Sequence, residues 1–275
     1  MKRRLLQLAL AGLTGATLLI PAAAHAATPS SVLYDSTPVK GTVSAPSVGA
    51  EAYSFSQVGN EVILRNHTAA VRHVFVTMVS WACQHGNWNA GCTTTPGTTF
   101  TAPITLNLYR HSRTDQTTGA VVPGRRILSI TRNFRIHYRP SSLPADGGEY
   151  DGTTYKGRDG QPHHGLAQTI AFPMNVKLPS DVVWTVSYNT SHHGPKPLGD
   201  AAPGTVHQTD NLNVGLTPKA RVGLDRLPHS IFWDTTYAPF TCGGGFQTTG
   251  LLNRDGACTM GAWDGMVPAA QFSTK

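Results

Sequence analysis

The sequence predicts an all-β protein: a single large two-sheet β-sandwich, jelly-roll-like in topology, with long Gly- and Pro-rich loops. Three observations support this. Apolar and polar residues alternate in about ten to twelve short segments bounded by turn residues, as in antiparallel strands. Beyond the N-terminal segment, no stretch of about ten residues has helical periodicity. Charged residues make up only 13% of the chain, about half the usual ~25%, while Gly (28 residues) and Pro (19) are abundant.

Residues 1–26 have the features of a secretory signal peptide. Three basic residues, Lys2 to Arg4, precede an apolar run from Leu5 to Ile20, and Ala24-His25-Ala26 provides a small-x-small cleavage site. Arg3-Arg4 matches a twin-arginine signal only in part, so ordinary secretion is favoured. We therefore expect an extracellular domain at residues 27–275, without a membrane span because no second long hydrophobic segment follows.

Short strands are predicted throughout the first third of this domain. They lie at Val32–Tyr34, Ala50–Phe55, Val62–Leu64 and Val74–Trp81, with turns at Gly59-Asn60 and Asn66–Thr68. The segment from Val74 to Trp81 is apolar on both faces, which is typical of a strand in the centre of a sheet. Trp81 and Trp184, both on predicted strands, are expected in the core.

The rest of the domain repeats this pattern. Strict alternation in Ile104–Tyr109 places Ile104, Leu106 and Leu108 inward. From Leu128 to Tyr138 the inward row is interrupted by Arg132, which indicates a bulge or a sheet edge. Residues 139–165 are predicted to form a long loop. Further strands are predicted at Leu166–Phe172, Val182–Tyr188, Leu212–Leu216, Ile231–Trp233 and Met266–Phe272.

The net charge argues against nucleic-acid binding. The formal charge is +7, of which three positive charges belong to the signal peptide, so the mature chain carries +4. Its basic residues are scattered and rarely alternate with aromatic residues, whereas a nucleic-acid interface needs a denser basic stripe.

The four cysteines form two pairs that are local in sequence. Cys83 and Cys92 flank one Gly-containing loop, and Cys242 and Cys258 flank another. In an oxidising compartment this arrangement favours two local disulfides among the three possible pairings. Zinc binding by four thiolates is the alternative, but neither pair has the spacing of a zinc knuckle.

Several segments resemble a group of secreted bacterial β-sandwich proteins that have no assigned activity. The resemblance covers essentially the whole mature chain, and it implies the fold without implying a function. The matching segments are Trp81–Cys83 through Thr95–Gly97, Pro103–Tyr109, Tyr188–Gly194, Leu212–Leu216, Trp233–Tyr237 and Val267–Phe272. Members of this group often carry another cysteine pair near Tyr150–Tyr155, which this chain lacks.

No enzyme motif is complete. Glu149-Tyr150-Asp151 matches the start of the E-x-D-x-x-E strand motif of some sandwich glucanases, but Thr154 occupies the position of the second Glu. Glycoside hydrolysis requires two carboxyl groups with different roles. Nor does the chain contain the G-x-S-x-G nucleophile elbow.

Two sets of loop residues are candidate metal ligands. Asp146, Glu149, Asp151 and Asp159 could supply the oxygen ligands that calcium requires, although a solvated turn explains them as well. We therefore expect no cofactor other than a structural calcium at these residues. The histidines of the long loops are weaker candidates for a transition-metal site, because adjacent residues on an extended chain point in opposite directions. They are His163, His164, His192, His193 and His207.

Two loop tryptophans suggest carbohydrate binding. Trp88 lies between Asn87 and Asn89 within the Cys83–Cys92 loop, and Trp263 precedes Asp264 just after Cys258. An exposed ring covers the C–H face of a sugar while amide and carboxylate groups bind its hydroxyls. The alternative is that both rings fold back onto the core.

These features predict a secreted, non-enzymatic binding or surface-associated protein, with carbohydrate as the leading ligand and a polysaccharide or cell-wall glycan as the partner. Two alternatives stay open. One is a polysaccharide-active hydrolase or lyase, which would need two carboxyl groups about 5–9.5 Å apart. The other is a purely structural extracellular protein.

Overall fold

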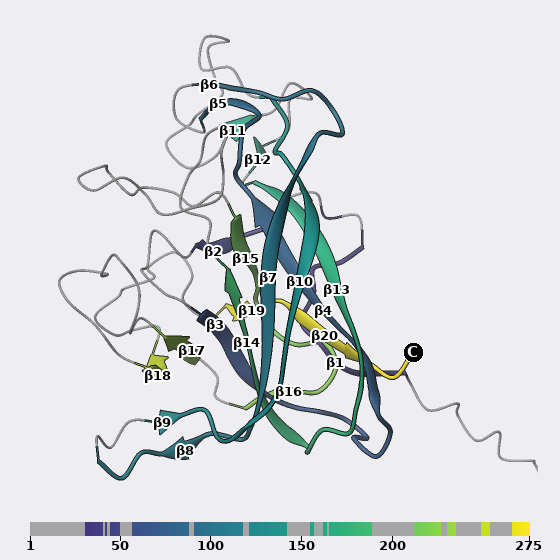
Figure 1. Cartoon of the computed structure of the whole chain (residues 1–275), viewed down its shortest axis with the longest axis vertical. Helices are drawn as coiled ribbons and strands as arrows, with labels where there is room; N and C mark the ends of the chain where they lie inside the picture. Colours follow the sequence, from purple (N-terminus) through teal and green to yellow (C-terminus); the bar gives the residue numbers. More distant parts are fainter. Residues whose placement is uncertain are drawn as a thin grey trace, which may run out of the picture. The chain divides into compact units, whose positions relative to one another are not determined.

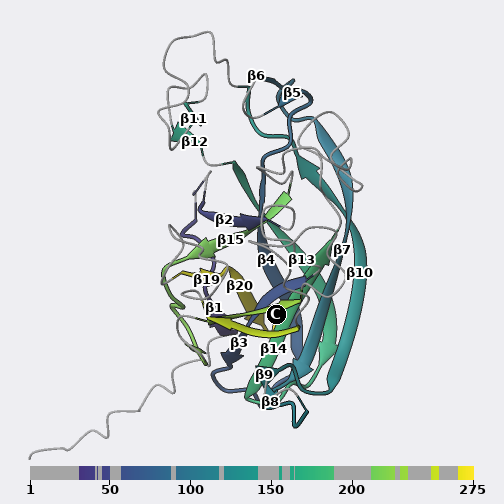
Figure 2. The same cartoon turned by 90° about the vertical axis from the view of Figure 1, so that its left-hand side faces the viewer.

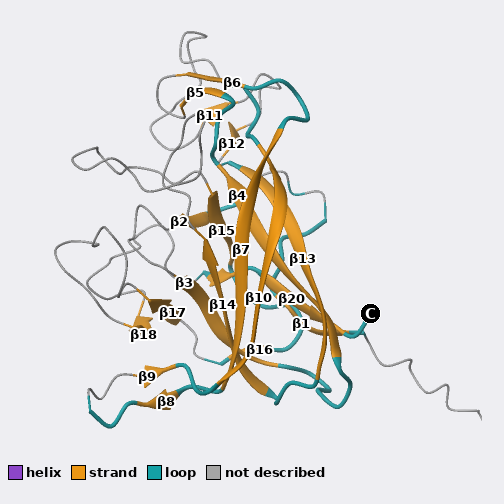
Figure 3. Ribbon diagram, in the orientation of Figure 1, coloured by secondary structure: helices purple, strands orange, loops and turns teal. Residues whose placement is uncertain are grey.

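The structure is a computed structural model of the chain. It describes residues 31–40, 42, 45–49, 57–87, 91–117, 121–141, 155–156, 162–163, 165–188, 212–226, 230–234, 249–253 and 266–275. All of them belong to one compact unit, Ser31–Lys275. None of the described residues is helical, and most lie in strands (Figure 3). The all-β prediction is therefore confirmed.

Sheet I has seven strands. They are β1 (Val32–Asp35), β2 (Ser47–Gly49), β4 (Val71–Ser80), β13 (Leu166–Val176), β15 (Leu212–Thr217), β19 (Val267–Pro268) and β20 (Ala270–Ser273). The centre of the sheet is β4, which pairs with β13 along one edge and with β20 and then β15 along the other. The prediction of a central strand from its two-faced apolar pattern is thus confirmed.

Sheet II also has seven strands. They are β3 (Gln57–Ile63), β7 (Thr99–Arg110), β10 (Arg126–His137), β14 (Asp181–Tyr188), β16 (Leu224–Asp225), β17 (Ser230–Asp234) and β18 (Thr249–Asn253). The order across the sheet is β10, β7, β14, β3, β17 and β18, with β16 also pairing with β3. The two views in Figure 1 and Figure 2 show β7 and β10 running side by side, in an unbroken register from Leu128 to His137.

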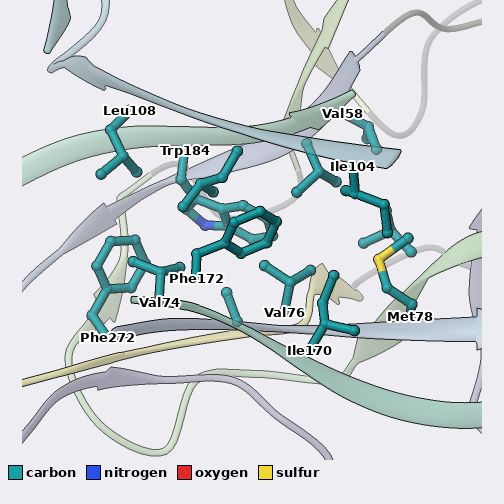
Figure 4. Close-up of a cluster of buried hydrophobic side chains, with 14 of the residues drawn as sticks. Val58, Val74, Val76, Met78, Ile104, Leu108, Ile170, Phe172, Trp184 and Phe272 are labelled. Atoms are coloured by element: carbon teal, nitrogen blue, oxygen red, sulfur yellow. The ribbon is translucent and has the colours of Figure 1, made fainter. Parts of the chain in front are cut away.

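The core lies between the two sheets (Figure 4). Residues that alternate along the strands supply it, because every second side chain of a strand faces the opposite sheet. Sheet I contributes Val74, Val76, Met78, Ile170, Phe172 and Phe272, and sheet II contributes Val58, Ile104, Leu106, Leu108, Val182, Trp184 and Val186. The two-sheet sandwich is thereby confirmed, whereas its jelly-roll connectivity stays a prediction.

Three two-stranded ribbons lie outside the main sheets. They are β5 (His85–Asn87) with β6 (Gly91–Thr93), β8 (Arg113–Thr114) with β9 (Val121–Val122), and β11 (Tyr155–Lys156) with β12 (Pro162–His163). The first is the hairpin of the Cys83–Cys92 segment, and the third lies within the long loop predicted for residues 139–165.

The predicted turn at Gly59-Asn60 is wrong, because both residues lie inside β3. A Cβ atom on Gly59 would overlap the carbonyl oxygen of Trp184 and lie 2.6 Å from the Cα of Thr185. Glycine is therefore needed here because β14 approaches closely, a common reason for glycine within a strand. The predicted bend at Asn66–Thr68 is confirmed, and Asn66 has a positive φ of 53°.

Two other expectations are refined. β10 is the edge strand of sheet II, which explains why Arg132 is exposed on an inward row; the register irregularity lies elsewhere, between Arg126 and Leu128. Trp184 is fully buried as expected, but Trp81 lies beyond the end of β4 and is only partly buried. Its indole N–H donates to Ser47 Oγ at 3.3 Å, and the Arg139 guanidinium lies 5.6 Å from its ring centroid.

Candidate functional site

The loop residues predicted to bind carbohydrate lie largely outside the described part of the chain. Asn87 ends β5 and pairs with Gly91 of β6. The side chain of Asn87 is not described, nor are the residues Trp88, Asn89, Trp263 and Asp264. Their role in sugar binding stays a prediction.

The predicted metal ligands have the same status. Asp146, Glu149, Asp151 and Asp159 all lie outside the described residues, as do His164, His192, His193 and His207. Within the described ranges, no three His, Cys, Asp or Glu side chains are grouped so that they could hold a metal ion. The structural calcium and the carboxylate pair of a hydrolase therefore stay predictions.

The two cysteines of one predicted disulfide, Cys83 and Cys92, lie within the described residues. Cys83 is buried just before β5, and Cys92 lies in β6 opposite Gly86. No cysteine among the described residues is a free thiol. The pairing of Cys83 with Cys92 stays a prediction, as does that of Cys242 with Cys258, which lie outside the described ranges.

The described residues contain a different candidate, on the outer face of sheet II. Four neighbouring strands, β3, β14, β7 and β10, contribute side chains that alternate with core residues and therefore point away from the core. We call this surface the polar face. It comprises Gln57, Thr105, Asn107, Tyr109, Ser129, Thr131, Thr185 and Ser187.

Strand register brings these side chains together. Thr185 of β14 pairs with Asn107 of β7, which pairs in turn with Ser129 of β10. The next row contains Ser187, Thr105 and Thr131. The rows therefore bring together hydroxyl and amide groups from segments that are far apart in sequence.

The side-chain carbonyl of Gln57 is the centre of the polar face. Its Oε1 atom accepts hydrogen bonds from Thr185 Oγ1 at 2.7 Å, Tyr109 OH at 3.2 Å and, more weakly, Asn107 Nδ2 at 3.5 Å. These three donors come from two strands other than that of Gln57. One amide oxygen thus fixes the positions of a hydroxyl, a phenol and a second amide.

Tyr109 lies across the sheet. Its Cα is on β7, its hydroxyl reaches Gln57 on β3, and β14 lies between these two strands. The Tyr109 side chain therefore crosses the outer face of β14 to reach Gln57. Tyr109 is partly exposed, whereas Val183 and Thr185 are buried. This arrangement leaves an aromatic surface close to a cluster of hydroxyl and amide groups.

The amide of Asn107 fixes the positions of Ser187 and Ser129, which belong to the rest of the polar face. Asn107 Nδ2 donates to Ser187 Oγ at 3.3 Å, and Asn107 Oδ1 accepts from Ser129 Oγ at 2.8 Å. In the adjacent row, the hydroxyls of Thr105 and Thr131 lie 2.7 Å apart. Ser129 and Thr131 are exposed, so this part of the polar face is open to solvent. All eight side chains of the polar face are uncharged near neutral pH.

A buried carboxylate fixes the chain next to Tyr109. Glu61 is 1% exposed and accepts hydrogen bonds from the backbone N–H of Ser112 at 2.9 Å and from Ser112 Oγ at 2.6 Å. These bonds satisfy the two carboxylate oxygens of Glu61, which would be costly to bury without hydrogen-bond partners. They attach the segment after β7 to β3, and they therefore restrain the end of β7 that carries Tyr109.

Alternation in the sequence indicates part of this site. Strict alternation in Ile104–Tyr109 places three residues inward, and the same pattern places Thr105, Asn107 and Tyr109 outward on one face. What the sequence lacked was the pairing of strands, since Tyr109 meets a residue 52 positions away and Gln57 meets Thr185 at a separation of 128.

The comparisons add no assignment to this geometry. No protein-family model matches the chain, and neither a curated protein nor a solved structure matches it. Among the described residues, no helix has the length and apolar character needed to cross a membrane.

Proposed function

We propose that this protein is a secreted, non-enzymatic β-sandwich that binds carbohydrate, and that the polar face is a contact surface for a polysaccharide or cell-wall glycan. The observation that carries the proposal is the convergence of Tyr109, Thr185 and Asn107 on the carbonyl of Gln57. The signal peptide predicted for residues 1–26 supports an extracellular site of action.

The chemistry of the polar face is complementary to that of a neutral sugar. A sugar has an apolar C–H face, which packs on an aromatic ring, and a rim of hydroxyls, which hydrogen-bond to amides and hydroxyls. Tyr109 supplies the ring. The exposed hydroxyls of Ser129 and Thr131 keep acceptor capacity within the face, so sugar hydroxyls can donate to them.

The hydrogen bonds within the polar face also favour binding. Gln57, Asn107 and Tyr109 have flexible side chains, and ordering them on binding would reduce the affinity. Their mutual contacts restrict them in the free protein. The polar face should therefore bind a glycan with a smaller entropic penalty than unlinked side chains would incur.

The test is a binding assay on the mature protein with a glycan array and with insoluble polysaccharides. For a glycan that binds the wild type, Tyr109→Ala should weaken binding about tenfold, equivalent to roughly 1.4 kcal/mol. Tyr109→Phe keeps the ring and should retain most of the affinity. Thr101→Ala is the matched control, because Thr101 is exposed on the same strand but belongs to neither row of the polar face.

Trp88→Ala belongs in the same experiment. A loss of binding in Trp88→Ala together with full binding in Tyr109→Ala would reject the polar face and place the glycan on the β5–β6 hairpin. Failure of the wild type to bind any glycan would reject the proposal as a whole. Release of soluble sugar from the polysaccharide would replace it with the hydrolase or lyase alternative.

A further inference from the structure

An apolar cavity of about 350 Å³ lies beside the end of β15 in sheet I. One wall comes from described residues between β1 and β2, and the other comes from the end of β15 and the residues that follow it. The lining residues are Thr37, Pro38, Val39, Thr42, Ala45, Pro46, Leu216, Thr217, Pro218, Lys219 and Arg221. We call it the β15 pocket.

The two walls of the β15 pocket are held together by hydrogen bonds. The backbone N–H of Leu216 donates to Pro46 O at 2.7 Å, and Thr217 Oγ1 donates to Ser36 O at 2.6 Å. Within the first wall, the backbone N–H and Oγ1 of Thr42 both bond to Val39 O, at 3.1 and 2.8 Å. These bonds give the pocket a defined shape without a ligand, as is usual for small-molecule sites.

Apolar side chains dominate the pocket, and one of them is unusually exposed. Val39 is 67% exposed, and only one other large hydrophobic residue of the described part, Leu224 at 62%, is comparably exposed. Val39 borders the pocket whereas Leu224 does not. An apolar ligand in the pocket would remove Val39 from water, which is favourable in proportion to the area covered.

The pocket also carries positive charge. Arg221 Nη2 is engaged by Asp35 Oδ2 at 2.8 Å and by Thr37 Oγ1 at 3.2 Å, so its charge is largely neutralised. Lys219 is exposed and forms no ion pair with any described residue, and Lys40 on the turn after Val39 has the same properties. The unpaired charge near the pocket is therefore positive.

We propose that the β15 pocket binds a small amphiphile with an unbranched aliphatic chain and a carboxylate head, such as octanoate, with the chain against Val39 and Leu216 and the carboxylate near Lys219. The apolar walls are unsuited to a sugar, which needs hydrogen-bond partners around its ring. This site is therefore separate from the polar face, and its ligand belongs to another chemical class.

A homologous series tests the aliphatic part by isothermal titration calorimetry on the mature protein. Hexanoate, octanoate and decanoate should bind with affinity that rises about fourfold for each methylene group entering the pocket. Val39→Ser should weaken octanoate binding about fivefold, because it removes apolar surface without adding charge. Leu224→Ser is the matched control and should leave octanoate binding unchanged, since Leu224 has similar exposure outside the pocket.

The head group is tested by comparing octanoate with octanol. Lys219→Gln should weaken octanoate binding up to about fivefold, the range of an exposed ion pair, and should leave octanol binding unchanged. Lys177→Gln, which removes an exposed lysine outside the pocket, should affect neither ligand. An equal effect of Lys219→Gln on both ligands would overturn the assignment of the carboxylate. Absence of saturable octanoate binding, or equal effects of Val39→Ser and Leu224→Ser, would overturn the site.

Discussion

At the centre of sheet II, β3 and β14 lie so close that no side-chain atom fits between them at Gly59. The edge at which sheet II meets sheet I differs. There β10 and β13 are bridged through a side chain, since Gln168 Nε2 donates to Arg135 O at 2.7 Å and Gln168 Oε1 accepts from the backbone N–H of His137 at 3.1 Å. The carboxamide thus takes the place of a peptide group of a neighbouring strand.

This difference shows how the sandwich distributes its stability. The centre depends on close packing, where an added or removed carbon atom is costly. The edges depend on a few polar contacts that are partly exposed, and each of these contributes less. Substitutions at the centre should therefore destabilise the protein more than substitutions at an edge.

The largest effect is expected for Trp184→Ala at the centre. Trp184 is fully buried and packs between the sheets (Figure 4). Removing the ring should lower the free energy of unfolding by about 3–5 kcal/mol, measured by chemical denaturation. Trp184→Phe is the control and should cost less, because it retains a ring and because the indole N–H makes no hydrogen bond with the described residues. Equal losses for the two variants would contradict the packing argument.

Gly59→Ala should follow, with a loss of about 1–3 kcal/mol or more. The added methyl group would force β3 and β14 apart, because it would meet the backbone of Trp184 and Thr185. Gly97→Ala provides the comparison. Gly97 has a positive φ of 83° but open space around the position of a Cβ. If the two variants had the same stability in thermal or denaturant unfolding, the close approach of β14 would not explain the glycine at position 59.

A smaller effect is expected at the edge. Gln168→Ala removes both bonds between β10 and β13 and should cost about 1 kcal/mol, since these bonds are exposed to solvent. Hydrogen exchange should show faster exchange of the His137 amide. Gln116→Ala is the control. It removes an exposed glutamine whose Nε2 donates to Thr114 O of the adjacent strand β8, and it should change neither the stability nor the His137 exchange rate. An unchanged His137 exchange rate in Gln168→Ala would show that the edge is closed by packing alone.

The smallest effect concerns the opposite edge of sheet I, where β1 carries Asp35. Burial raises the pKa of this carboxyl, but hydrogen bonds from Thr37 and Arg221 outweigh it and hold the pKa below its ordinary value. A carboxyl with a depressed folded-state pKa stabilises the protein above its unfolded pKa of about 3.9 and loses this contribution as the pH falls. Wild type should thus be more stable than Asp35→Asn at pH 6, with the difference shrinking below about pH 4. A difference independent of pH would contradict this.

Alternation in the sequence was sufficient to predict the faces of the long strands. In Ile104–Tyr109 and Val182–Tyr188 it separated the core residues from the outer ones, because a side chain in a strand has only two directions to face. The apolar residues on both faces of Val74–Trp81 also indicated β4 as a central strand. Gly59-Asn60 was misassigned because glycine beside asparagine is typical of a turn, whereas here glycine is required by a neighbouring strand 125 or more residues away.

The candidate site could be predicted only in part. Composition and local spacing drew attention to Trp88 and Trp263, since aromatic residues in Gly- and Asn-rich loops are conspicuous in a sequence. The polar face was not found, because Gln57, Tyr109 and Thr185 belong to three strands whose order in sheet II is not encoded locally. The β15 pocket likewise joins two segments that are at least 170 residues apart, and no local sequence pattern indicates it.

The pairing of β1 with β20 has a consequence for the order of events during synthesis. Tyr34 lies opposite Phe272, and β20 also occupies the edge of β4 from His73 to Val76. Sheet I can therefore close only after residue 273 has left the ribosome, and such long-range pairing makes folding slow. General secretion, which we propose for this protein, requires an unfolded chain, and a late pairing of β1 with β20 is compatible with that requirement. For the proposed secreted protein, we expect folding to be completed after export, when β1 and β20 can pair.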